Sequence, residues 1–402
     1  MTRREEIAET ILNRGVVTDI IPDKESFRKR LLSQEPMKIY IGADATAPKL
    51  HLGHAQNYMI LEEIRQLGHE VIVLFGDFTA RIGDPSDRMS ARSQLSAEEA
   101  NRNVEKWVEQ IRPLIDFDAK DNPPRILFNS DWLSNLSMQD VVELASNTTV
   151  QRMLERDMFI KRMEAEKPIH LHEFLYPLMQ GYDSVALDID AELCGTDQTF
   201  NALVGRTLLD KLRNKDKFVV TTRLLQNPKT GELMSKSRGT GVFLDNSPFD
   251  LFGAVMEQPD EMVKPILVSN TRIPLDEVDR ICASGNPRDA KMRAAFEVTR
   301  IFHGEEKATS AQEKFVALVQ RKETTEDLPQ VTIEHQKPTL FQLVRSCLGG
   351  GTSNSEVRRL IKQGAVKVDG SQMNDGDQEV EVLDDGVTVK VGKKWWFKVT
   401  SS

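Results

Sequence analysis

MKIYIGADATAPKLHLGHAQNYMILEEIRQLGHEVIVLF, residues 37–75, carries the strongest indication of fold in this chain. Residues 37–42 form an apolar run typical of a buried strand, and the apolar side chains between Leu52 and Leu67 recur at helical spacing. Gly68 suits the end of that helix, and residues 71–75 form a second apolar run. A strand, a helix and a strand within about forty residues predict a βαβ unit. We therefore expect a parallel sheet of the dinucleotide-binding type, whose ligands bind at the carboxyl ends of the strands.

Helices and strands continue to alternate beyond this unit. The expected elements are a helix at 96–111, a strand at 125–128, a largely helical stretch to residue 180, a strand at 184–190 and a helix at 198–213. The region 248–320 is charged and helical in pattern, and 321–337 is polar enough to be a linker. The tail, 338–402, indicates two short helices followed by strands. A chain of this length suits two or three domains.

The composition of the 402 residues narrows the class of protein. Cys194, Cys282 and Cys347 lie far apart without paired spacing, which argues against a disulfide framework and against a thiolate metal site. No apolar run is long enough to span a membrane, and the first residues do not resemble a targeting segment, so we expect a cytoplasmic protein. The formal net charge of −9 disfavours nucleic acid as a partner unless basic residues are concentrated locally.

Two short motifs suit phosphate binding. His51-Leu-Gly-His54 opens the predicted helix, where unpaired backbone N–H groups and the positive end of the helix dipole favour an anion. Met234-Ser-Lys-Ser237 lies in a glycine-flanked loop, where Lys236 offers a point charge. Taken singly, the first motif is more simply a capped helix start and the second an exposed turn. Their occurrence together, in this order, is specific.

The two motifs resemble the signature pair of class I aminoacyl-tRNA synthetases. The resemblance covers essentially the whole chain, because further blocks follow the pattern of tyrosyl-tRNA synthetases in order: GADATAPKLHLGH at 42–54, GDPS at 83–86, NSDW at 129–132 and GTDQ at 195–198. It implies an enzyme that activates tyrosine with ATP and then esterifies it to the 3′ end of a transfer RNA.

The fold that the resemblance implies is α/β, with three parts. A Rossmann-like parallel-sheet catalytic domain is expected at 1–230, with a connective insertion at about 129–165. The signature loop and a helical anticodon-binding domain are expected at 231–330, and a small C-terminal α+β RNA-binding module at 338–402. The expected partners are L-tyrosine, ATP, tRNA(Tyr) and a second copy of the chain, with the dimer interface near residues 129–161.

Tyr176, Gln180 and Asp183 are spaced so that they share one face of a helix. Because the neighbouring residues are largely apolar, these groups need polar partners, which a ligand supplies. By resemblance, Asp84, Tyr176 and Gln180 hold the amino group of tyrosine, and Tyr40 and Asp183 hydrogen-bond its phenolic hydroxyl. Phenylalanine is then rejected because it leaves Asp183 unpaired, a kind of discrimination for which tyrosyl-tRNA synthetases are themselves a standard example.

The resemblance also assigns residues to ATP and to catalysis. Gln198 orients the reacting carboxylate. The ATP-binding residues that it implies are Gly42, Asp44, Thr46, His51, Gly53, His54, Gly195, Asp197, Met234, Ser235, Lys236 and Ser237. The catalytic set that it implies is Thr46, His51, His54, Arg88, Arg92 and Lys236. No metal-ligand cluster is visible, and Mg²⁺ is expected only on the ATP phosphates, so that positioning and charge stabilisation provide the catalysis.

The sequence departs from the family pattern at three places. Ala45 stands where proline is usual, which costs loop rigidity. Leu233 replaces the first lysine of the usual KMSKS motif, and Arg238 in the same loop is a candidate to compensate for the lost charge. Residues 238–241 also differ from the usual Gly-Asn ending.

Basic residues are concentrated in the tail, on a segment that resembles a small RNA-binding module of ribosomal proteins and bacterial tyrosyl-tRNA synthetases. The expected RNA-binding residues are Arg358, Arg359, Lys362 and Lys367, supported by Lys393, Lys394, Trp395 and Trp396. A solvated surface helix is the plainer alternative.

Two other functions stay open at this point. A tryptophanyl-tRNA synthetase shares the fold, but Tyr40 with Asp183 argues against it, because an indole has no hydroxyl. An RNA-binding relative that no longer aminoacylates is the second, and the intact His51, His54 and Lys236 argue against it.

Overall fold

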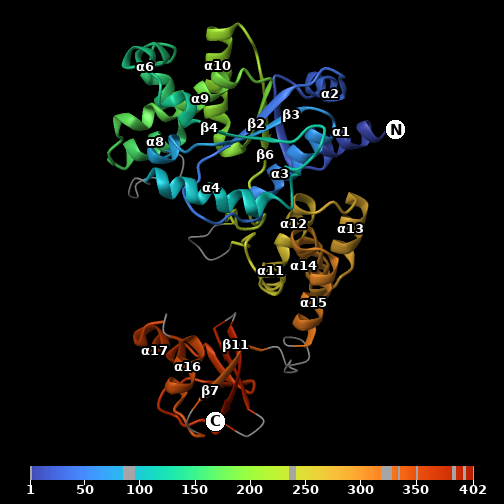
Figure 1. Ribbon diagram of the computed structural model, residues 1–402, viewed down its shortest axis with the longest axis vertical. Helices are drawn as coiled ribbons and strands as arrows, with labels where there is room; N and C mark the ends of the chain where they lie inside the picture. The colour runs from blue at the N-terminus through green and yellow to red at the C-terminus, as the bar shows by residue number, and fades with distance from the viewer. Residues whose placement is uncertain are drawn as a thin grey trace. The chain divides into compact units, whose positions relative to one another are not determined.

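The computed structural model describes residues 2–84, 96–234, 241–317, 328–333, 336–349, 352–382, 386–392 and 395–401 (Figure 1). The chain divides into two compact units. The first comprises Met1–Ser247 and Gly253–Glu305, and the second comprises Pro248–Phe252 and Glu306–Ser402. None of the described helices has the length and apolar character that crossing a membrane requires.

A six-stranded sheet lies at the centre of the first unit. Its strands are β1 (Val17–Ile21), β2 (Lys38–Ala43), β3 (Glu70–Phe75), β4 (Arg125–Phe128), β5 (Ala191–Gly195) and β6 (Phe218–Thr222). The order is β1-β6-β5-β2-β3-β4, and all neighbours are parallel except β1, which pairs antiparallel with β6. The predicted βαβ unit consists of β2, α3 (Leu52–Gln66) and β3. The Rossmann-like parallel sheet expected from the sequence is therefore confirmed.

Helices surround this sheet. They are α1 (Arg3–Asn13), α2 (Lys24–Leu32), α4 (Ala97–Ile111), α5 (Ser130–Leu133), α6 (Met138–Ala145), α7 (Val150–Leu154), α8 (Asp157–Glu164), α9 (Tyr176–Leu187) and α10 (Thr199–Arg213), with short 3₁₀ turns η1 (Thr79–Arg81), η2 (Leu171–Phe174) and η3 (Thr196–Gln198). Helices α9 and α10 lie side by side (Figure 1). They approach closely because of two glycines: a Cβ on Gly181 would lie 3.1 Å from the backbone nitrogen of Gly205.

The prediction of a strand at 184–190 is wrong. Helix α9 continues to Leu187, and Asp188 then takes a left-handed conformation, with φ of 48°, that ends the helix. The strand of this region is β5, which begins at Ala191. The error arises because Val185 and Ile189, both buried, are four residues apart, a spacing that fits a helix as well as an alternating strand.

The region after residue 247 is helical, as the sequence predicts. Its elements are α11 (Pro248–Met256), η4 (Asp260–Met262), α12 (Val263–Asn270), α13 (Leu275–Ala283), α14 (Pro287–His303) and α15 (Glu305–Phe315). Helix α12 is tied to the sheet-containing part of the first unit. Arg14 Nε donates to the carbonyl of Val268 over 2.7 Å, and the Asn270 side chain donates to the carbonyl of Leu52 over 2.8 Å. The second bond supports the first turn of α3.

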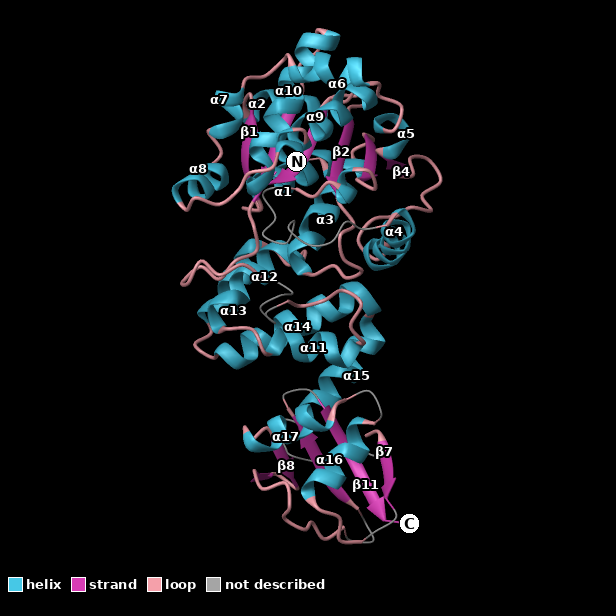
Figure 2. Cartoon of the chain, turned by 90° about the vertical axis from the view of Figure 1, so that its left-hand side faces the viewer, coloured by secondary structure: helices cyan, strands magenta, loops and turns pink. Residues whose placement is uncertain are grey.

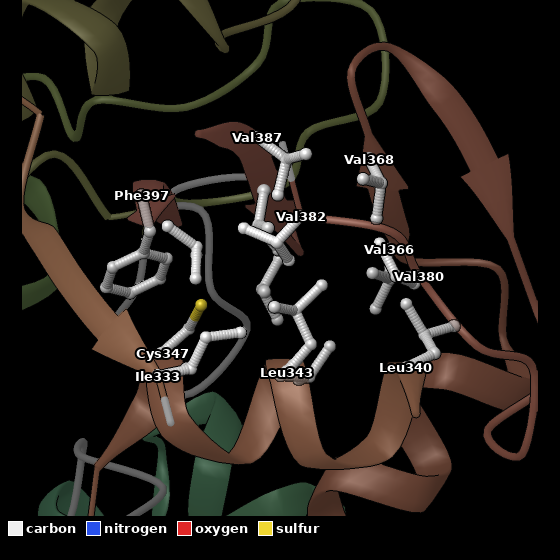
Figure 3. Close-up of a cluster of buried hydrophobic side chains, with 14 of the residues drawn as sticks. Ile333, Leu340, Leu343, Cys347, Val366, Val368, Val380, Val382, Val387 and Phe397 are labelled. Carbon is white, nitrogen blue, oxygen red and sulfur yellow. The ribbon is translucent and has the colours of Figure 1, made fainter. Parts of the chain in front are cut away.

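The second unit contains a five-stranded sheet covered by two helices (Figure 2). Its elements are β7 (Gln330–Ile333), α16 (Leu340–Leu348), α17 (Asn354–Lys362), β8 (Val366–Val368), β9 (Ser371–Met373), β10 (Val387–Val391) and β11 (Trp395–Ser401), and the strand order is β7-β11-β10-β8-β9. Leu340, Leu343 and Cys347 of α16 point toward the strands and form a core with their valines (Figure 3). The two short helices and the following strands are as predicted.

The linker expected at 321–337 needs correction, because part of it is the edge strand β7. This strand pairs in parallel with β11, and the pairing joins Val331 to Val399 and Ile333 to Ser401. A four-residue strand with only two apolar side chains is too short to show a clear period in the sequence.

Candidate active site

The carboxyl ends of parallel strands meet at one edge of the first sheet. Asp44 follows β2, Gly76 follows β3 and Gly195 ends β5. This edge is where ligands bind in open α/β sheets. The described residues of the HLGH and GTDQ motifs lie here, together with one face of α9.

His51 and His54 lie at the N-terminus of α3, where His51 is the capping residue. The Gly53 N–H donates to His51 Nδ1, and the His51 N–H donates to His54 Nδ1, each over 3.2 Å. Because each Nδ1 is an acceptor, each neutral ring carries its proton on Nε2. Burial lowers the pKa of His51 to about 2 and that of His54 to about 4. The pair therefore presents two neutral N–H donors at the positive end of a helix, which suits phosphate oxygens.

We expect His54 to lower stability in acid. Its pKa lies below the value of about 6.5 in an unfolded chain, so the unfolded state binds more protons and the free energy of unfolding falls as the pH drops from 6.5 toward 4. Asp44 has the opposite effect on the free energy of unfolding. Burial raises its pKa to about 7, so the folded state binds the additional proton as the pH falls. Comparison with a His54→Gln variant isolates the contribution of His54 to this pH dependence. The urea midpoint of the unchanged chain should fall relative to that of the variant between about pH 7 and pH 4.5, whereas a constant difference would contradict the assignment.

The loop between β2 and α3 is held by one face of α4. Asn103, Trp107 and Gln110 donate to the carbonyls of Ala45, Ala47 and Pro48 over 2.8, 2.6 and 2.9 Å. Gln110 also accepts from the Leu50 N–H over 2.8 Å. These four bonds order the loop, although Ala45 replaces the usual proline.

Asp44 is the centre of one polar group. Its carboxylate accepts from the Tyr176 hydroxyl over 2.9 Å and from the Thr79 hydroxyl over 2.7 Å. Gly76 is required for this approach, since a Cβ there would lie 1.9 Å from Asp44 Oδ1. Burial, together with the charges of Asp44 and Asp84, raises the pKa of Tyr176 well above its usual value. The Tyr176 phenol is therefore neutral and donates to Asp44.

Asp183 is the centre of a second polar group, deeper in the fold. It is 3% exposed and accepts from the Trp132 indole N–H over 2.8 Å and from the Asn129 side chain over 3.4 Å. Tyr40 is fully buried nearby, in an apolar cluster with Ile72, and its hydroxyl lies 3.2 Å from Ser184 Oγ. Burial raises the pKa of Asp183 well above its usual value. The structure thus brings Tyr40 and Asp183 together in a largely apolar surrounding.

Amides and carboxylates form a third group. Gln198 donates to Asp84 over 2.7 Å, Asn201 donates to both Gln198 and Gln180 over 2.9 Å, and Gln180 donates to Glu192 over 3.3 Å. Through Asn201 the structure joins predicted residues from α9, from the turn after β5 and from the loop after η1. All six residues predicted for tyrosine thus lie in these three groups.

The other predicted residues are only partly described. Thr46 is exposed and its N–H donates to the Asp44 carbonyl over 2.7 Å, and Gly42 and Asp197 are also exposed. Met234 is buried and its N–H donates to the Leu225 carbonyl over 2.9 Å, whereas Leu233 is 42% exposed. Residues 85–95 and 235–240 lie outside the described residues. They include Arg88, Arg92, Ser235, Lys236, Ser237 and Arg238.

In the tail, the predicted basic residues lie on the surface. Arg358, Arg359, Lys362 and Lys367 are all exposed. Arg358 lies 4.7 Å from the centre of the Phe341 ring, and Arg359 pairs with Glu356 over 2.6 Å. Trp395 is 60% exposed, and Lys393 and Lys394 lie outside the described part of the chain.

Comparison with known sequences identifies the family. The family described as tRNA synthetases class I (W and Y) matches residues 32–320. The tyrosine–tRNA ligase of Moorella thermoacetica is 42% identical over 96% of this chain and 93% of its own length. That of Thermotoga maritima is 40% identical over 100% of this chain and 98% of its own length. The chain belongs to the class I tRNA synthetases, in the group of the tyrosine–tRNA ligases.

Solved structures agree on the fold of this synthetase. A C-terminally truncated mitochondrial tyrosyl-tRNA synthetase of Aspergillus nidulans superposes with a TM-score of 0.64 at 23% identity, over 78% of this chain and 94% of that one. A tyrosyl-tRNA synthetase of Archaeoglobus fulgidus in complex with L-tyrosine gives 0.59 at 19% identity, over 77% and 100%.

Sequence reasoning assigned no role to several residues that contact the predicted site residues in the structure. Asn129 and Trp132 stand in the NSDW block, but the motif did not show that they hold Asp183. Arg156 gave no signal: it is 7% exposed, its guanidinium lies 5.0 Å from the Phe200 ring centre, and its buried Nη1 has no hydrogen-bond partner among the described residues. The sequence analysis also assigned no role to Glu192 and Lys217. An acidic or basic residue within an apolar strand run was the signal available for both.

Proposed function

We propose that this synthetase activates tyrosine with ATP to tyrosyl-adenylate and pyrophosphate, and then transfers tyrosine to the 3′ end of tRNA(Tyr). The observation that carries the proposal is Asp183. A buried carboxylate, held by Trp132 and Asn129 beside Tyr40, is an acceptor for a hydroxyl in an otherwise apolar place. A phenol donates to such an acceptor and also accepts from a donor, whereas an indole only donates and a phenyl ring does neither.

The remaining polar groups suit the other end of the amino acid. Asp84, Tyr176 and Gln180 would hold the ammonium group, since Asp84 and the Tyr176–Asp44 pair supply negative charge. Gln198, which donates to Asp84, would orient the reacting carboxylate. The amino acid would then lie with its ring at Asp183 and its carboxylate toward the nucleotide.

The proposed nucleotide site surrounds the start of α3. His51, His54 and Thr46 would contact phosphate oxygens, while Gly42, Asp44, Gly53, Gly195 and Asp197 would surround the ribose and adenylate. By their place in the sequence, Arg88, Arg92, Met234, Ser235, Lys236 and Ser237 would close over the pyrophosphate. The described residues include no group of three His, Cys, Asp or Glu side chains suited to a metal ion, so Mg²⁺ would enter on the ATP phosphates and neutralise part of their charge.

The reaction needs no protein nucleophile. A carboxylate oxygen of tyrosine attacks the α-phosphorus in line, and pyrophosphate leaves. The protein positions the two reactants and stabilises the charge that develops on the phosphate oxygens.

The direct test is pyrophosphate exchange by the full-length chain with each of the twenty amino acids. Exchange that depends on tyrosine supports the proposal. Exchange that depends on tryptophan instead would refute it, and so would a lack of exchange with any of the twenty amino acids.

We propose that residues 1–230 form the catalytic domain, that the helical region within 231–330 binds the anticodon arm, and that the tail binds tRNA. A chain that ends at residue 317, before β7, should still form tyrosyl-adenylate but should charge tRNA poorly. The basic tail residues contribute salt-dependent affinity for phosphates, and their loss should raise KM for tRNA at least about tenfold. Initial charging rates at limiting tRNA provide the measurement. Equal rates for the shortened and full-length chains would contradict the assignment.

We also propose a homodimer, formed through the region of about residues 129–161. Large apolar side chains are exposed in this region and just beyond it: Met138 (78%), Val142 (62%), Val150 (65%), Ile160 (38%), Met163 (45%) and Leu171 (81%). Val142→Glu should weaken self-association roughly 100-fold, because the dimer would bury an unpaired charge. Sedimentation equilibrium measures the effect. Leu275→Glu, at a similarly apolar but distant position that is 39% exposed, is the control and should leave association unchanged.

A cytoplasmic location is the remaining proposal. All three cysteines are free thiols, which suits a reducing compartment.

A further inference from the structure

A buried ion pair lies beneath the proposed tyrosine site. Lys217 Nζ pairs with Glu192 Oε2 and also donates to Ser184 Oγ over 2.7 Å. The side chains of Lys217 and Glu192 are 0% and 2% exposed. Glu192 is the register partner of Tyr40 in the β2–β5 pairing, so the two side chains lie on the same face of the sheet.

The fold makes room for this pair. A Cβ on Gly205 would lie 2.8 Å from Lys217 Nζ and 2.8 Å from Ser184 Oγ. Burying two charges costs free energy that their mutual attraction often fails to recover, so a buried pair is weak evidence for a stabilising role. None of the steps derived above uses Lys217 or Ser184.

The pair is connected to both ends of the tyrosine site. Ser184 Oγ lies 3.2 Å from the Tyr40 hydroxyl, and Lys217 Nζ lies 5.8 Å from the centre of the Tyr40 ring. Glu192 accepts from Gln180 through its other oxygen, over 3.3 Å. A single buried unit therefore contacts the residue proposed for the phenol and a residue proposed for the amino group.

The donors and acceptors in this unit have a preferred direction. An ammonium group only donates, so Ser184 Oγ must accept from Lys217, and its own hydrogen is available for Tyr40. If Ser184 donates to Tyr40, the Tyr40 hydrogen is left for an acceptor, which is Glu192 in the structure and, in competition with it, the oxygen of a bound phenol. A bound phenol that donates its hydrogen to Asp183 needs a donor for its lone pair, and Tyr40 supplies one. A charge at the start of such a chain strengthens the bonds along it.

We propose that Lys217, acting through Ser184, orients the Tyr40 hydroxyl as a hydrogen-bond donor to the phenol of bound tyrosine, so that Ser184 and Lys217 are positioning residues for tyrosine selectivity. This proposal rests on the proposed function above. It assigns to the buried ion pair a role in recognition in addition to its place in the core.

The first arm of the test removes the Ser184 hydroxyl. Pyrophosphate exchange by the full-length chain is measured with tyrosine and with phenylalanine. Ser184→Ala should lower kcat/KM for tyrosine about tenfold, mainly through KM, and leave that for phenylalanine unchanged. Ser269→Ala is the matched control, because Ser269 is 1% exposed and its buried hydroxyl has no hydrogen-bond partner in the part of the chain that the structure describes. An unchanged tyrosine-to-phenylalanine ratio in Ser184→Ala, or an equal loss for both substrates, would overturn the proposal.

The second arm separates positioning from folding. Lys217→Met alone leaves Glu192 buried and unpaired and should lower the melting temperature, whereas Lys217→Met with Glu192→Gln removes both charges and should recover most of it. We expect the double variant to keep the reduced tyrosine selectivity. Recovery of both the melting temperature and the selectivity would show that the pair is only structural. Absence of tyrosine-dependent exchange in the unchanged chain would refute the proposed function itself, which distinguishes the two failures.

Discussion

Replacing Asp183 by alanine is expected to lower kcat/KM for tyrosine at least about 100-fold, while kcat/KM for phenylalanine stays nearly unchanged. Asp183 is the buried acceptor beside Tyr40, and the N–H donors of Trp132 and Asn129 favour its charged form against the effect of burial, which raises its pKa. A hydrogen bond to a charged group contributes about 1.5–3 kcal/mol, and the phenolic hydroxyl would in addition be buried without its acceptor. Phenylalanine has no hydroxyl and loses neither contribution.

Pyrophosphate exchange with each amino acid in turn measures the change in selectivity. Asp210→Ala is the control, since Asp210 is an exposed carboxylate on α10. Trp132→Phe provides a second check, because it removes the donor that holds Asp183 at 2.8 Å but keeps the carboxylate. It should weaken selectivity less than Asp183→Ala does. A tyrosine preference that survives Asp183→Ala would reject the assignment of this residue to the phenol.

Replacing His51 by asparagine is expected to slow adenylate formation about 10²–10³-fold, with little change in tyrosine affinity. Asparagine can still accept from the N–H groups at the helix start, so α3 should begin at the same residue. It does not place an N–H donor where His51 Nε2 lies. Donors that are already oriented toward developing charge act mainly on the transition state, and their loss therefore appears in the rate of the chemical step.

Single-turnover measurement of adenylate formation at saturating ATP gives this rate, and equilibrium dialysis gives the tyrosine affinity. Since burial lowers the pKa of His51 to about 2, the effect should be the same at pH 6 and pH 8. His172→Asn, at an exposed histidine, is the control. A rate within threefold of that of the unchanged chain would show that His51 only caps the helix.

The predictions that succeeded depend on residues close together in the sequence. His51 and His54 are three residues apart, and their cap geometry follows from the chain entering α3. Tyr176, Gln180 and Asp183 share a face because of helical period alone. The strand expected at 184–190 failed for the same reason, since a few residues did not distinguish helical spacing from strand alternation.

The sequence by itself determined the βαβ unit, the two signature motifs, the helical spacing of Tyr176, Gln180 and Asp183, and the two-helix, multi-strand tail. Only the tertiary structure showed that Trp132 and Asn129 hold Asp183, that α4 holds the loop at Ala45, that β7 joins the C-terminal sheet, and that Lys217 and Glu192 pair beneath Tyr40. These contacts join residues from 25 positions apart, as for Lys217 and Glu192, to 68 positions apart, as for Val331 and Val399. Local propensity and period act over a few residues, whereas the partner of a buried polar group is decided by which strands and helices pack together, and that is a property of the folded chain as a whole.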